Sequence, residues 1–363
     1  MTALPPGSTI GILGGGQLAR MLALAASRLG LKSHIYAPEA DSPAFDVAAT
    51  HTVAGYHDTT ALTAFAKSIN VATYEFENIP VSTVDFLLNL VPVRPGAKAL
   101  ACAQDRLYEK KLARELGAMT AEFAVVDSEA ELRHRLQTIV PPCVLKTRRL
   151  GYDGKGQAKI LNLDDAAAAW AGMQDQASIL ESFVNFDCEV SVVAARSPDG
   201  EFRAFDVTEN EHRNHILHRS IAPARISPSA REEAIAIAKR IAERLDYAGV
   251  FAIEFFALKT DEGTTLYVNE MAPRVHNSGH WTQDGCATSQ FEQHIRAVAG
   301  WPLGSTQMTA PGAEMINLIG DDIHTWKAIA TEPGAYLHHY GKKDARPGRK
   351  MGHVNRRLDK APQ

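Results

Sequence analysis

The sequence has little of what marks several classes of protein. Only four of its 363 residues are cysteine and none lies in a C-x-x-C spacing, which argues against a zinc site or a disulfide framework at Cys102, Cys143, Cys188 and Cys286. The formal net charge of -4 is small for this length, so overall charge directs the protein neither to nucleic acid nor to an anionic membrane. No apolar run approaches the roughly 18 residues of a membrane span, and residues 1–6 lack the basic start of a targeting segment. We therefore predict a cytoplasmic protein with reduced thiols and no nucleic-acid or membrane partner.

What the chain does contain is an ordinary globular composition, with 45% hydrophobic and 22% charged residues, and enough length for two or three domains. The first hundred residues alternate short apolar runs with helical patterns. They predict strands at 9–13, 33–36 and 71–74, and helices at 17–29, 60–68 and 82–90. This βαβ rhythm is typical of a parallel sheet with helices on both faces.

After residue 125 the composition changes to strands interrupted by glycine, which indicates an α+β domain. A helix at 104–116 precedes this change, and further helices are expected at 130–136, 165–173 and 228–245. Strands are expected at 143–147, 157–160, 178–183, 189–195, 204–208, 249–258 and 264–270. A small unit follows Pro302 and ends in a basic segment at 342–357. Such a segment is usually solvated and sometimes binds nucleic acid, but its interleaved glycines favour a structured loop around one phosphate.

A glycine run follows the first predicted strand and opens the first predicted helix. Gly14, Gly16 and Ala19 fit the pattern G-x-G-x-x-G/A, in which backbone amides at a helix N-terminus approach a phosphate. Doubly wound domains also use such a turn without binding a ligand there. The motif alone leaves both interpretations open.

A second glycine loop, residues 151–157, directly follows a strand that carries Lys146. Backbone amides of such a loop can cover a phosphate chain while the lysine supplies positive charge. The alternative is a hairpin turn with a solvated lysine at its edge. The spacing does not match a Walker A sequence.

Two glutamates on the last predicted hairpin are candidate metal ligands. A hairpin centred on Glu262 would place Glu254 directly opposite Glu270, on the same face of the sheet. Two facing carboxylates destabilise a sheet unless a cation lies between them, and Mg²⁺ shares carboxylate oxygens with substrate phosphates. A solvated pair on an exposed hairpin is the alternative. The neighbouring Asn269 and Arg274 favour a phosphate ligand.

A strand end at residues 181–184 could present backbone donors and acceptors to a flat heterocycle, with Glu189 within reach of a ribose hydroxyl. Taken singly, this segment is equally typical of a solvated acidic strand end.

Four segments together resemble the N5-carboxyaminoimidazole ribonucleotide synthetase family of ATP-grasp enzymes. They are residues 14–18 (GGGQL), 151–157 (GYDGKGQ), 269–281 (NEMAPRVHNSGHW) and 348–355 (GRKMGHVN), in the order typical of that family. Ala19 and Val275 depart from the glycine and the proline expected there. The resemblance implies an ATP-grasp fold of mixed α/β and α+β class. Its parts would be a Rossmann-like N-terminal domain (1–103), an ATP-grasp domain (104–302) with a lid at about 122–186, and a small C-terminal domain (303–363).

The same resemblance implies a role for each matching residue. The ATP-binding set is Arg106, Lys146, Gly151, Tyr152, Asp153, Gly154, Lys155, Gly156, Gln157, Glu181, Ser182, Phe183, Val184, Glu189, His212, Asn269 and Glu270. The set for aminoimidazole ribonucleotide and bicarbonate is Gly16, Gln17, Leu18, Glu75, His276, Ser278, Lys342, Arg349 and Lys350. Glu254 and Glu270 would hold magnesium, and the expected catalytic residues are Asp153, Lys350 and Arg274.

The implied reaction uses ATP to activate bicarbonate as carboxyphosphate, which transfers its carboxyl group to the exocyclic amine of aminoimidazole ribonucleotide. Asp153 is our candidate for orienting or deprotonating that amine. A homodimer is the family expectation. Three alternatives remain: another ATP-grasp ligase, such as a glycinamide ribonucleotide synthetase or a biotin carboxylase relative; a dinucleotide-dependent oxidoreductase, based on residues 14–19 alone; and a non-catalytic ATP-binding regulator.

Overall fold

The computed structural model describes residues 2–151 and 155–362, so the predicted site residues Tyr152, Asp153 and Gly154 lie outside the described part. The N-terminal unit is a parallel sheet of order β3-β2-β1-β4. Its strands are β1 (Thr9–Leu13), β2 (Lys32–Ala37), β3 (Thr50–Val53) and β4 (Val71–Tyr74), and its helices are α1 (Gln17–Arg28), α2 (Thr59–Lys67) and α3 (Val81–Leu88). The parallel sheet was predicted, whereas β3 was missed because it is a polar, largely exposed edge strand.

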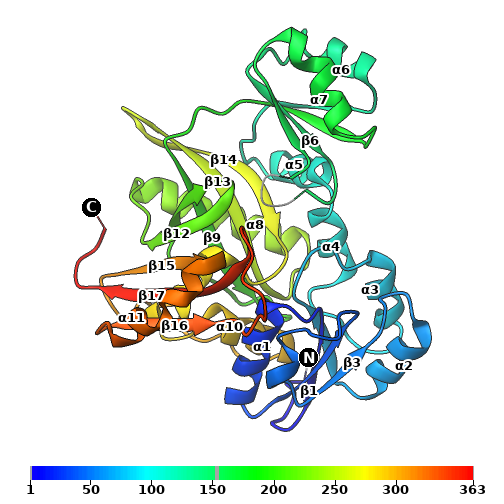
Figure 1. Ribbon diagram of the computed structural model, residues 1–363, viewed down its shortest axis with the longest axis vertical. Helices are drawn as coiled ribbons and strands as arrows, with labels where there is room; N and C mark the ends of the chain where they lie inside the picture. The colour runs from blue at the N-terminus through cyan, green and yellow to red at the C-terminus, as the bar shows by residue number, and fades with distance from the viewer. Residues whose placement is uncertain (1, 152–154, 363) are drawn as a thin grey trace.

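Two helices and a small lid come next in the chain. Helix α4 (Ala97–Ala103) leads to α5 (Arg106–Glu115), whose first turn is capped by the side chain of Asp105 accepting from the Leu107 amide. The lid is an antiparallel sheet of order β5-β8-β6-β7 covered by α6 (Glu129–Arg135) and α7 (Ala166–Gly172). Its strands are β5 (Phe123–Val126), β6 (Cys143–Thr147), β7 (Gln157–Ile160) and β8 (Ser178–Ser182). The lid lies at the top of Figure 1, away from the N-terminal unit at the lower right.

The largest sheet takes its strands from two distant parts of the chain. Its order is β14-β13-β9-β11-β12-β15-β17-β16, and β10 pairs with β9. The strands are β9 (Cys188–Arg196), β10 (Phe202–Ala204), β11 (Thr208–Arg213), β12 (Ile216–Ala222), β13 (Gly249–Thr260), β14 (Gly263–Ala272), β15 (Gly312–Ile319), β16 (Ala335–His339) and β17 (Lys350–Leu358). The C-terminal strands thus continue the sheet of the preceding unit, through the pairing of β15 with β12.

Two predictions about this sheet were wrong. The strand expected at 204–208 is a break between β10 and β11, because Phe205 and Val207 are buried in different hydrophobic clusters and cannot share one face of a strand. The basic segment expected as a loop becomes strand β17 from Lys350 onward, paired with β15 and β16.

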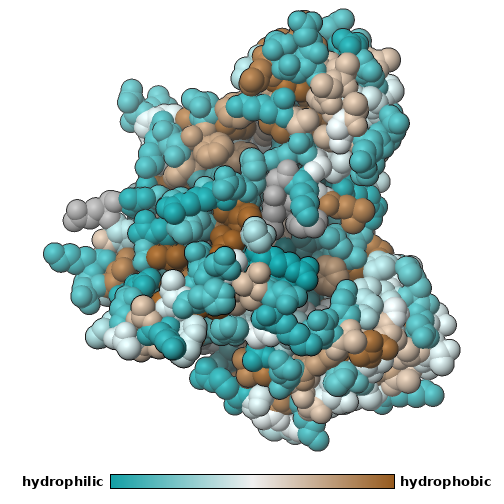
Figure 2. Space-filling model, in the orientation of Figure 1, coloured by the Kyte–Doolittle hydropathy of each residue, from teal (hydrophilic) through white to brown (hydrophobic). Residues whose placement is uncertain are grey.

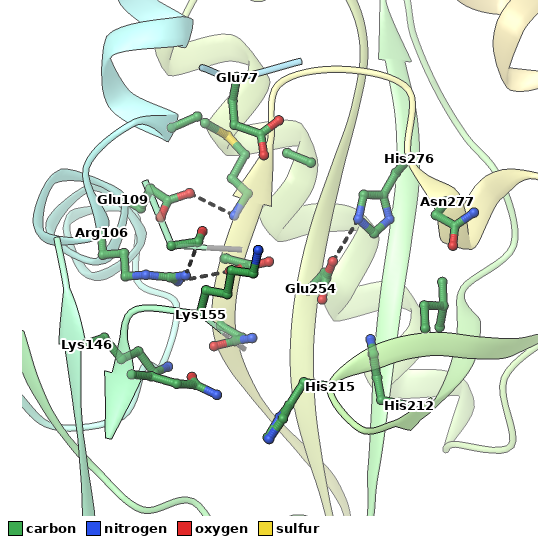
Figure 3. Close-up of a pocket in the computed structure, with 18 of the residues that line it drawn as sticks. Glu77, Arg106, Glu109, Lys146, Lys155, His212, His215, Glu254, His276 and Asn277 are labelled. Carbon is green, nitrogen blue, oxygen red and sulfur yellow. Dashed lines mark hydrogen bonds and ion pairs between the residues drawn. The ribbon is translucent and has the colours of Figure 1, made fainter. Parts of the chain in front are cut away.

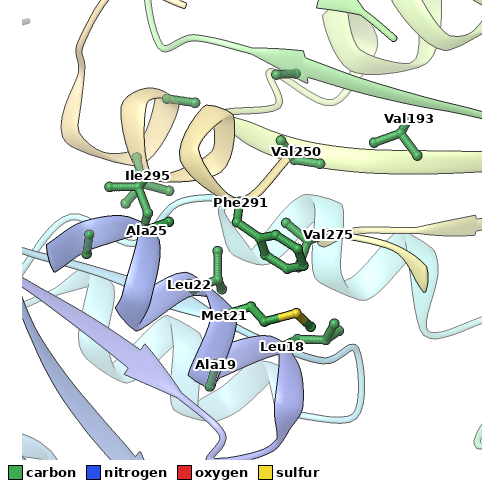
Figure 4. Close-up of a cluster of buried hydrophobic side chains, with 14 of the residues drawn as sticks. Leu18, Ala19, Met21, Leu22, Ala25, Val193, Val250, Val275, Phe291 and Ile295 are labelled. Atoms are coloured by element: carbon green, nitrogen blue, oxygen red, sulfur yellow. The ribbon is translucent and has the colours of Figure 1, made fainter. Parts of the chain in front are cut away.

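Helices cover both faces of the large sheet. Helix α8 (Pro228–Arg244) buries its apolar side in one cluster, and the Ser227 side chain caps its N-terminus by accepting from the Ala230 amide. Helix α10 (Gln290–Ala299) packs on the other face and also against α1, where Phe291 lies among Met21, Leu22 and Val275 (Figure 4). This contact joins the glycine turn before α1 to the large sheet.

The face drawn in Figure 2 is mostly hydrophilic, with hydrophobic residues in small groups. Within residues 2–151 and 155–362, every helix is too short or too polar to span a bilayer.

Candidate active site

A cavity of about 890 Å³ lies where the N-terminal unit, the lid and the large sheet meet. Of the predicted residues, those that line it are Gly16, Gln17, Leu18, Glu75, Arg106, Lys146, Gly151, Lys155, Gln157, Glu181, Ser182, Phe183, Val184, Glu189, His212, Glu254, Asn269, Glu270, Arg274, His276 and Lys350. Figure 3 shows Arg106, Glu109 and Lys146 on one side of this cavity and Glu254, His276 and His212 on the other. Residues that are up to 334 positions apart in the sequence (16 to 350) therefore surround one space.

Glu254 and Glu270 are directly opposite one another, as predicted, but for a different reason. The hairpin turns at Asp261 and Glu262, since Thr260 pairs with Gly263, and this register alone would place Glu254 opposite Asn269. An extra residue, Asn269, bulges from β14 and restores the pairing of the two glutamates.

Each of the two glutamates lies beside the side chain of a basic residue. Arg106 donates from Nη1 to Glu270 Oε2 at 2.9 Å, and His276 Nε2 lies 2.8 Å from Glu254 Oε1. Burial would raise the pKa of the Glu254 carboxyl, but His276 and His212 lower it to about 2. Glu254 is therefore an anion at neutral pH.

The donor set at this end of the hairpin fits a magnesium ion. Two facing carboxylates offer oxygen ligands, and the carbonyl oxygen Oδ1 of Asn269 is buried, without a hydrogen-bond partner, in a residue that lines the same cavity. Oxygen ligands from carboxylates and amides are those that Mg²⁺ prefers.

Lys146 belongs to a buried charge cluster in which Glu181 accepts from two lysines. Its Nζ lies 3.0 Å from Glu181 Oε2, and Nζ of Lys110 lies 3.2 Å from the same oxygen. Burial would raise the pKa of Glu181, but the two ammonium groups lower it to about 2. Two positive charges therefore lie beside one negative charge where the lid faces the cavity, and this excess of positive charge favours an anionic ligand.

The glycine turn before α1 is occupied by a side chain. The carboxylate of Glu75 accepts from the amides of Gly16 and Ala19, the latter at 2.8 Å. A Cβ at Gly14, where φ is +99°, would lie 2.5 Å from Glu75 Cγ, and one at Gly16 would lie 2.8 Å from its Oε1. The glycines are thus required by the close approach of Glu75. Burial raises the pKa of this carboxyl, although the two amides oppose the shift.

Glu189 and His212 form another pair in the cavity, with 3.2 Å between Glu189 Oε2 and His212 Nδ1. Burial lowers the pKa of His212, but the neighbouring Glu189 carboxylate outweighs it and raises the pKa overall. Within the described part of the chain, ligand atoms of Glu189, His212 and Glu254 lie within 4.8 Å of one another, the spacing of a possible metal site.

Several lining residues were missed by the sequence reasoning, among them Glu77, Glu109 and His215. Glu77 binds the guanidinium of Arg274 through both carboxylate oxygens, one of them 3.0 Å from Nη2. Glu109, on α5, accepts from the Met271 amide at 2.9 Å, and His215 lies beside β12. Glu77 follows a predicted strand end and could have been found there, whereas no local pattern distinguishes Glu109.

Some predicted residues do not line the cavity. Ser278 is fully buried behind it, and its hydroxyl lies 2.8 Å from Nδ1 of His276. Gly156 packs against Thr147 instead, so closely that a Cβ at this position would lie 2.5 Å from Thr147 Oγ1. Lys342 and Arg349 lie outside the lining, but Lys342 donates to the carbonyl of Lys350, which is part of it.

The Glu109 carboxyl leads to a prediction about stability. Burial raises its pKa to about 8, with Arg106 opposing and Glu270 adding to the shift. The folded state therefore holds a proton that the unfolded state releases near pH 4.3, so this group's contribution falls as pH rises from about 4.3 to about 8. We expect Glu109→Gln to gain stability relative to the parent between pH 5.5 and 8, by up to about 1.4 kcal/mol per pH unit in urea unfolding. The exposed Glu115→Gln is the matched control, and a difference that stays constant with pH would contradict the prediction.

Comparisons with known proteins match nearly the whole chain. Three family models align: the ribonucleotide synthetase preATP-grasp domain with residues 7–104, the ATP-grasp domain with 111–291, and the phosphoribosylaminoimidazole carboxylase C-terminal domain with 313–363. The N5-carboxyaminoimidazole ribonucleotide synthase of Brucella melitensis is 51% identical over 357 residues, which cover 98% of each protein.

Two solved structures are similar over nearly their full length. The ADP complex of an N5-carboxyaminoimidazole ribonucleotide synthetase superposes with a TM-score of 0.94 at 43% identity, covering 99% of this chain and 95% of the other. An Aspergillus clavatus synthase in complex with ADP and 5-aminoimidazole ribonucleotide gives a TM-score of 0.90 at 29% identity, covering 98% and 95%.

Proposed function

The chain belongs to the N5-carboxyaminoimidazole ribonucleotide synthase family of ATP-grasp ligases, and from this premise we propose how it carries out the family's reaction. The reaction is the ATP-dependent carboxylation of 5-aminoimidazole ribonucleotide in purine biosynthesis. Bicarbonate is the proposed carboxyl donor, with ADP and phosphate as the other products. The observation that carries the proposal is that both predicted sets of residues line the same cavity. The lid and the β13–β14 hairpin contribute residues of the ATP-binding set, and the α1 turn and β17 contribute residues of the ribonucleotide set.

ATP is proposed to lie between the lid and the hairpin. The segment of residues 181–184 and the pair Glu189 and His212 would receive the nucleoside, and Arg106 and Lys146 the phosphates. Magnesium, held by Glu254 and Glu270, would neutralise phosphate charge during transfer. The main contribution of the protein is then to position the reactants and to exclude water from carboxyphosphate.

Aminoimidazole ribonucleotide is proposed to bind at the N-terminal side, where Gln17, Glu75 and Lys350 line the cavity. Arg274, held by Glu77, would lie between the two substrates. Asp153 remains our candidate for the group that orients the amine. The protein is further proposed to act in the cytoplasm as a homodimer, with the three domains divided near residues 103 and 302, and sedimentation velocity would test the dimer.

The two enzymatic alternatives are less consistent with these observations. A dinucleotide-dependent oxidoreductase needs the amides of the α1 turn for a pyrophosphate, but Glu75 accepts from Gly16 and Ala19. Other ATP-grasp ligases leave unexplained the match of residues 313–363 to the phosphoribosylaminoimidazole carboxylase C-terminal domain.

The decisive experiment measures phosphate release from ATP and Mg²⁺ with and without aminoimidazole ribonucleotide, and follows ¹³C-bicarbonate by NMR. We expect phosphate release that depends on both substrates and a new carbamate carbon signal in equal amount. Equal turnover without the ribonucleotide, or turnover with phosphoribosylamine and glycine in its place, would overturn the proposal.

Lys342 belongs to the predicted ribonucleotide set although it lies outside the cavity lining, and a contact with the ribonucleotide phosphate would lead to proton uptake. Burial and the nearby Arg349 lower the pKa of Lys342 to about 8, although Glu75 opposes the shift. A bound phosphate would favour the charged ammonium, so binding of the ribonucleotide at pH 8 should take up about half a proton. We expect Lys342→Met to abolish this uptake and to raise the KM for the ribonucleotide roughly tenfold.

Calorimetry in buffers of different ionisation enthalpy measures the uptake. Lys343→Met, at an exposed neighbouring position, is the control that should keep both values. Unaltered proton uptake in Lys342→Met would assign the phosphate to another residue.

A further inference from the structure

A line of hydrogen bonds crosses the interior of the large sheet and ends at the cavity. It runs from Ser220 to Asn210 (2.8 Å), from Asn210 to Ser191 (2.9 Å), and from Ser191 to the hydroxyl of Ser278 (2.7 Å). The Ser278 hydroxyl lies 2.8 Å from Nδ1 of His276. The other ring nitrogen, Nε2, faces Glu254 Oε1 at 2.8 Å.

The three serines of this line are inaccessible to substrates. Ser191, Ser220 and Ser278 are 0% exposed, and none of them lines the cavity. They come from β9, β12 and the 3₁₀ turn Asn277–Gly279, so tertiary folding alone brings their hydroxyls together. Buried hydroxyls in such a continuous chain are costly to leave unpaired, and the chain therefore has one preferred arrangement of hydrogens.

The carboxylate at the end of the line sets the direction of every hydrogen bond. An ionised Glu254 can only accept, so Nε2 of His276 carries a hydrogen. In the neutral imidazole Nδ1 is then an acceptor, which Ser278 satisfies as the donor. Ser191 in turn donates to Ser278, and the amide of Asn210 donates to Ser191.

The backbone of His276 is fixed independently of this line. Its amide donates to Gln290 Oε1 at 2.8 Å, and its carbonyl accepts from Gln290 Nε2 at 2.7 Å. With the backbone held, the remaining freedom is rotation of the imidazole ring and the choice of its tautomer. The hydroxyl and amide of Ser278 at Nδ1 and the Glu254 carboxylate at Nε2 constrain these two.

We propose that Ser278, with Ser191 and Asn210 behind it, is a positioning residue that holds His276 in the tautomer and ring orientation that donates to Glu254. This line of hydrogen bonds thereby fixes the Glu254 carboxylate, which the proposed function assigns to magnesium. The expected effect on kcat rests on that proposed function, whereas the expected tautomer of His276 does not.

The direct test is the tautomer in the nucleotide-free protein. Long-range ¹H–¹⁵N spectra of histidine-labelled protein, with the His276 signals assigned from a His276→Asn variant, distinguish a protonated from an unprotonated ring nitrogen. We expect Nδ1 to be unprotonated and Nε2 protonated in the parent. A protonated Nδ1 in the parent would overturn the proposal without any positioning variant, and independently of the enzymatic activity.

The kinetic test compares Ser278→Ala with Ser191→Ala. Ser278→Ala removes the hydroxyl at 2.8 Å and leaves the Ser278 amide, 3.4 Å away, as the donor to Nδ1 of His276. We expect mixed tautomer signals and a kcat about tenfold lower, with an unchanged KM for the ribonucleotide. Ser191→Ala leaves the Ser278 donor in place and should have a smaller effect on kcat. Equal kcat values for Ser278→Ala and the parent would overturn the proposal.

The chain offers a matched control for the loss of a buried hydroxyl. Thr73 is 0% exposed, and its hydroxyl lies 2.8 Å from Nε2 of the buried His294, but neither residue lines the cavity. Thr73→Val should therefore lower the melting temperature while retaining the parental kcat and the His276 signals. A kcat loss in Thr73→Val equal to that in Ser278→Ala would show that destabilisation alone explains the effect, and would overturn the proposal.

Discussion

Glu270→Gln is expected to lower kcat about a thousandfold, the largest effect on activity that we predict. The substitution removes one of the two facing carboxylates and leaves Arg106 without the negative charge that it contacts at 2.9 Å. Metal-assisted charge neutralisation contributes several kcal/mol to such a transfer, and about 1.4 kcal/mol corresponds to a factor of ten in rate. Steady-state phosphate release over a series of Mg²⁺ concentrations measures the loss.

Glu262→Gln is the control, since it makes the same chemical change in the exposed turn of the same hairpin. It should keep the parental kcat. A Glu270→Gln enzyme with activity within tenfold of the parent would show that this carboxylate is not needed for the metal. The group of Glu189, His212 and Glu254 would then be the better candidate for the metal site.

The pairing of Glu254 with Glu270 shows how far a sequence can predict a site. Alternating apolar residues place both glutamates on one hairpin, and the pairing followed from a turn centred on Glu262. The actual turn is tighter and the bulge at Asn269 compensates for it. The local pattern predicted the element, whereas the exact register depends on a bulge that no periodicity reveals.

Strand positions were predicted best where an apolar run has clear ends. The bounds of β1, β4, β6 and β7 agree with the expected 9–13, 71–74, 143–147 and 157–160. Strands β11 and β12 were missed because they carry polar side chains on a sheet that is covered by neighbouring elements. Missing these two strands matters for function, since Asn210, His212 and Ser220 lie on them.

Residues that act through distant partners could not be found from local sequence. Lys110 is 1% exposed on α5, an improbable place for a lysine on pattern alone. Its burial is explained by Glu181, which lies 71 positions later in the sequence on β8, and by the carbonyl of Asn269, to which it donates at 3.3 Å. The inward direction of Ser278 likewise depends on the 3₁₀ turn Asn277–Gly279.

Glu181→Gln is expected to cause the largest loss of stability. Glu181 is 2% exposed and accepts from Lys146 and Lys110, so its replacement leaves two buried ammonium groups without a carboxylate. Removing one partner of a buried ion pair typically costs about 3–5 kcal/mol. Since the pKa of Glu181 is lowered to about 2, its contribution is complete above about pH 4.3 and is lost as the pH falls toward 2.

The measurement is urea unfolding near pH 7, with hydrogen exchange of the β6 and β8 amides to locate the loss in the lid. Glu129→Gln is the control, because Glu129 forms an exposed pair with Arg133 in the same lid and should cost no more than about 0.5 kcal/mol. Adding Lys110→Met to Glu181→Gln removes one uncompensated charge and should recover part of the stability. If the double variant is as unstable as Glu181→Gln alone, the unpaired charge of Lys110 is not the cause, and the loss must come from repacking around β8.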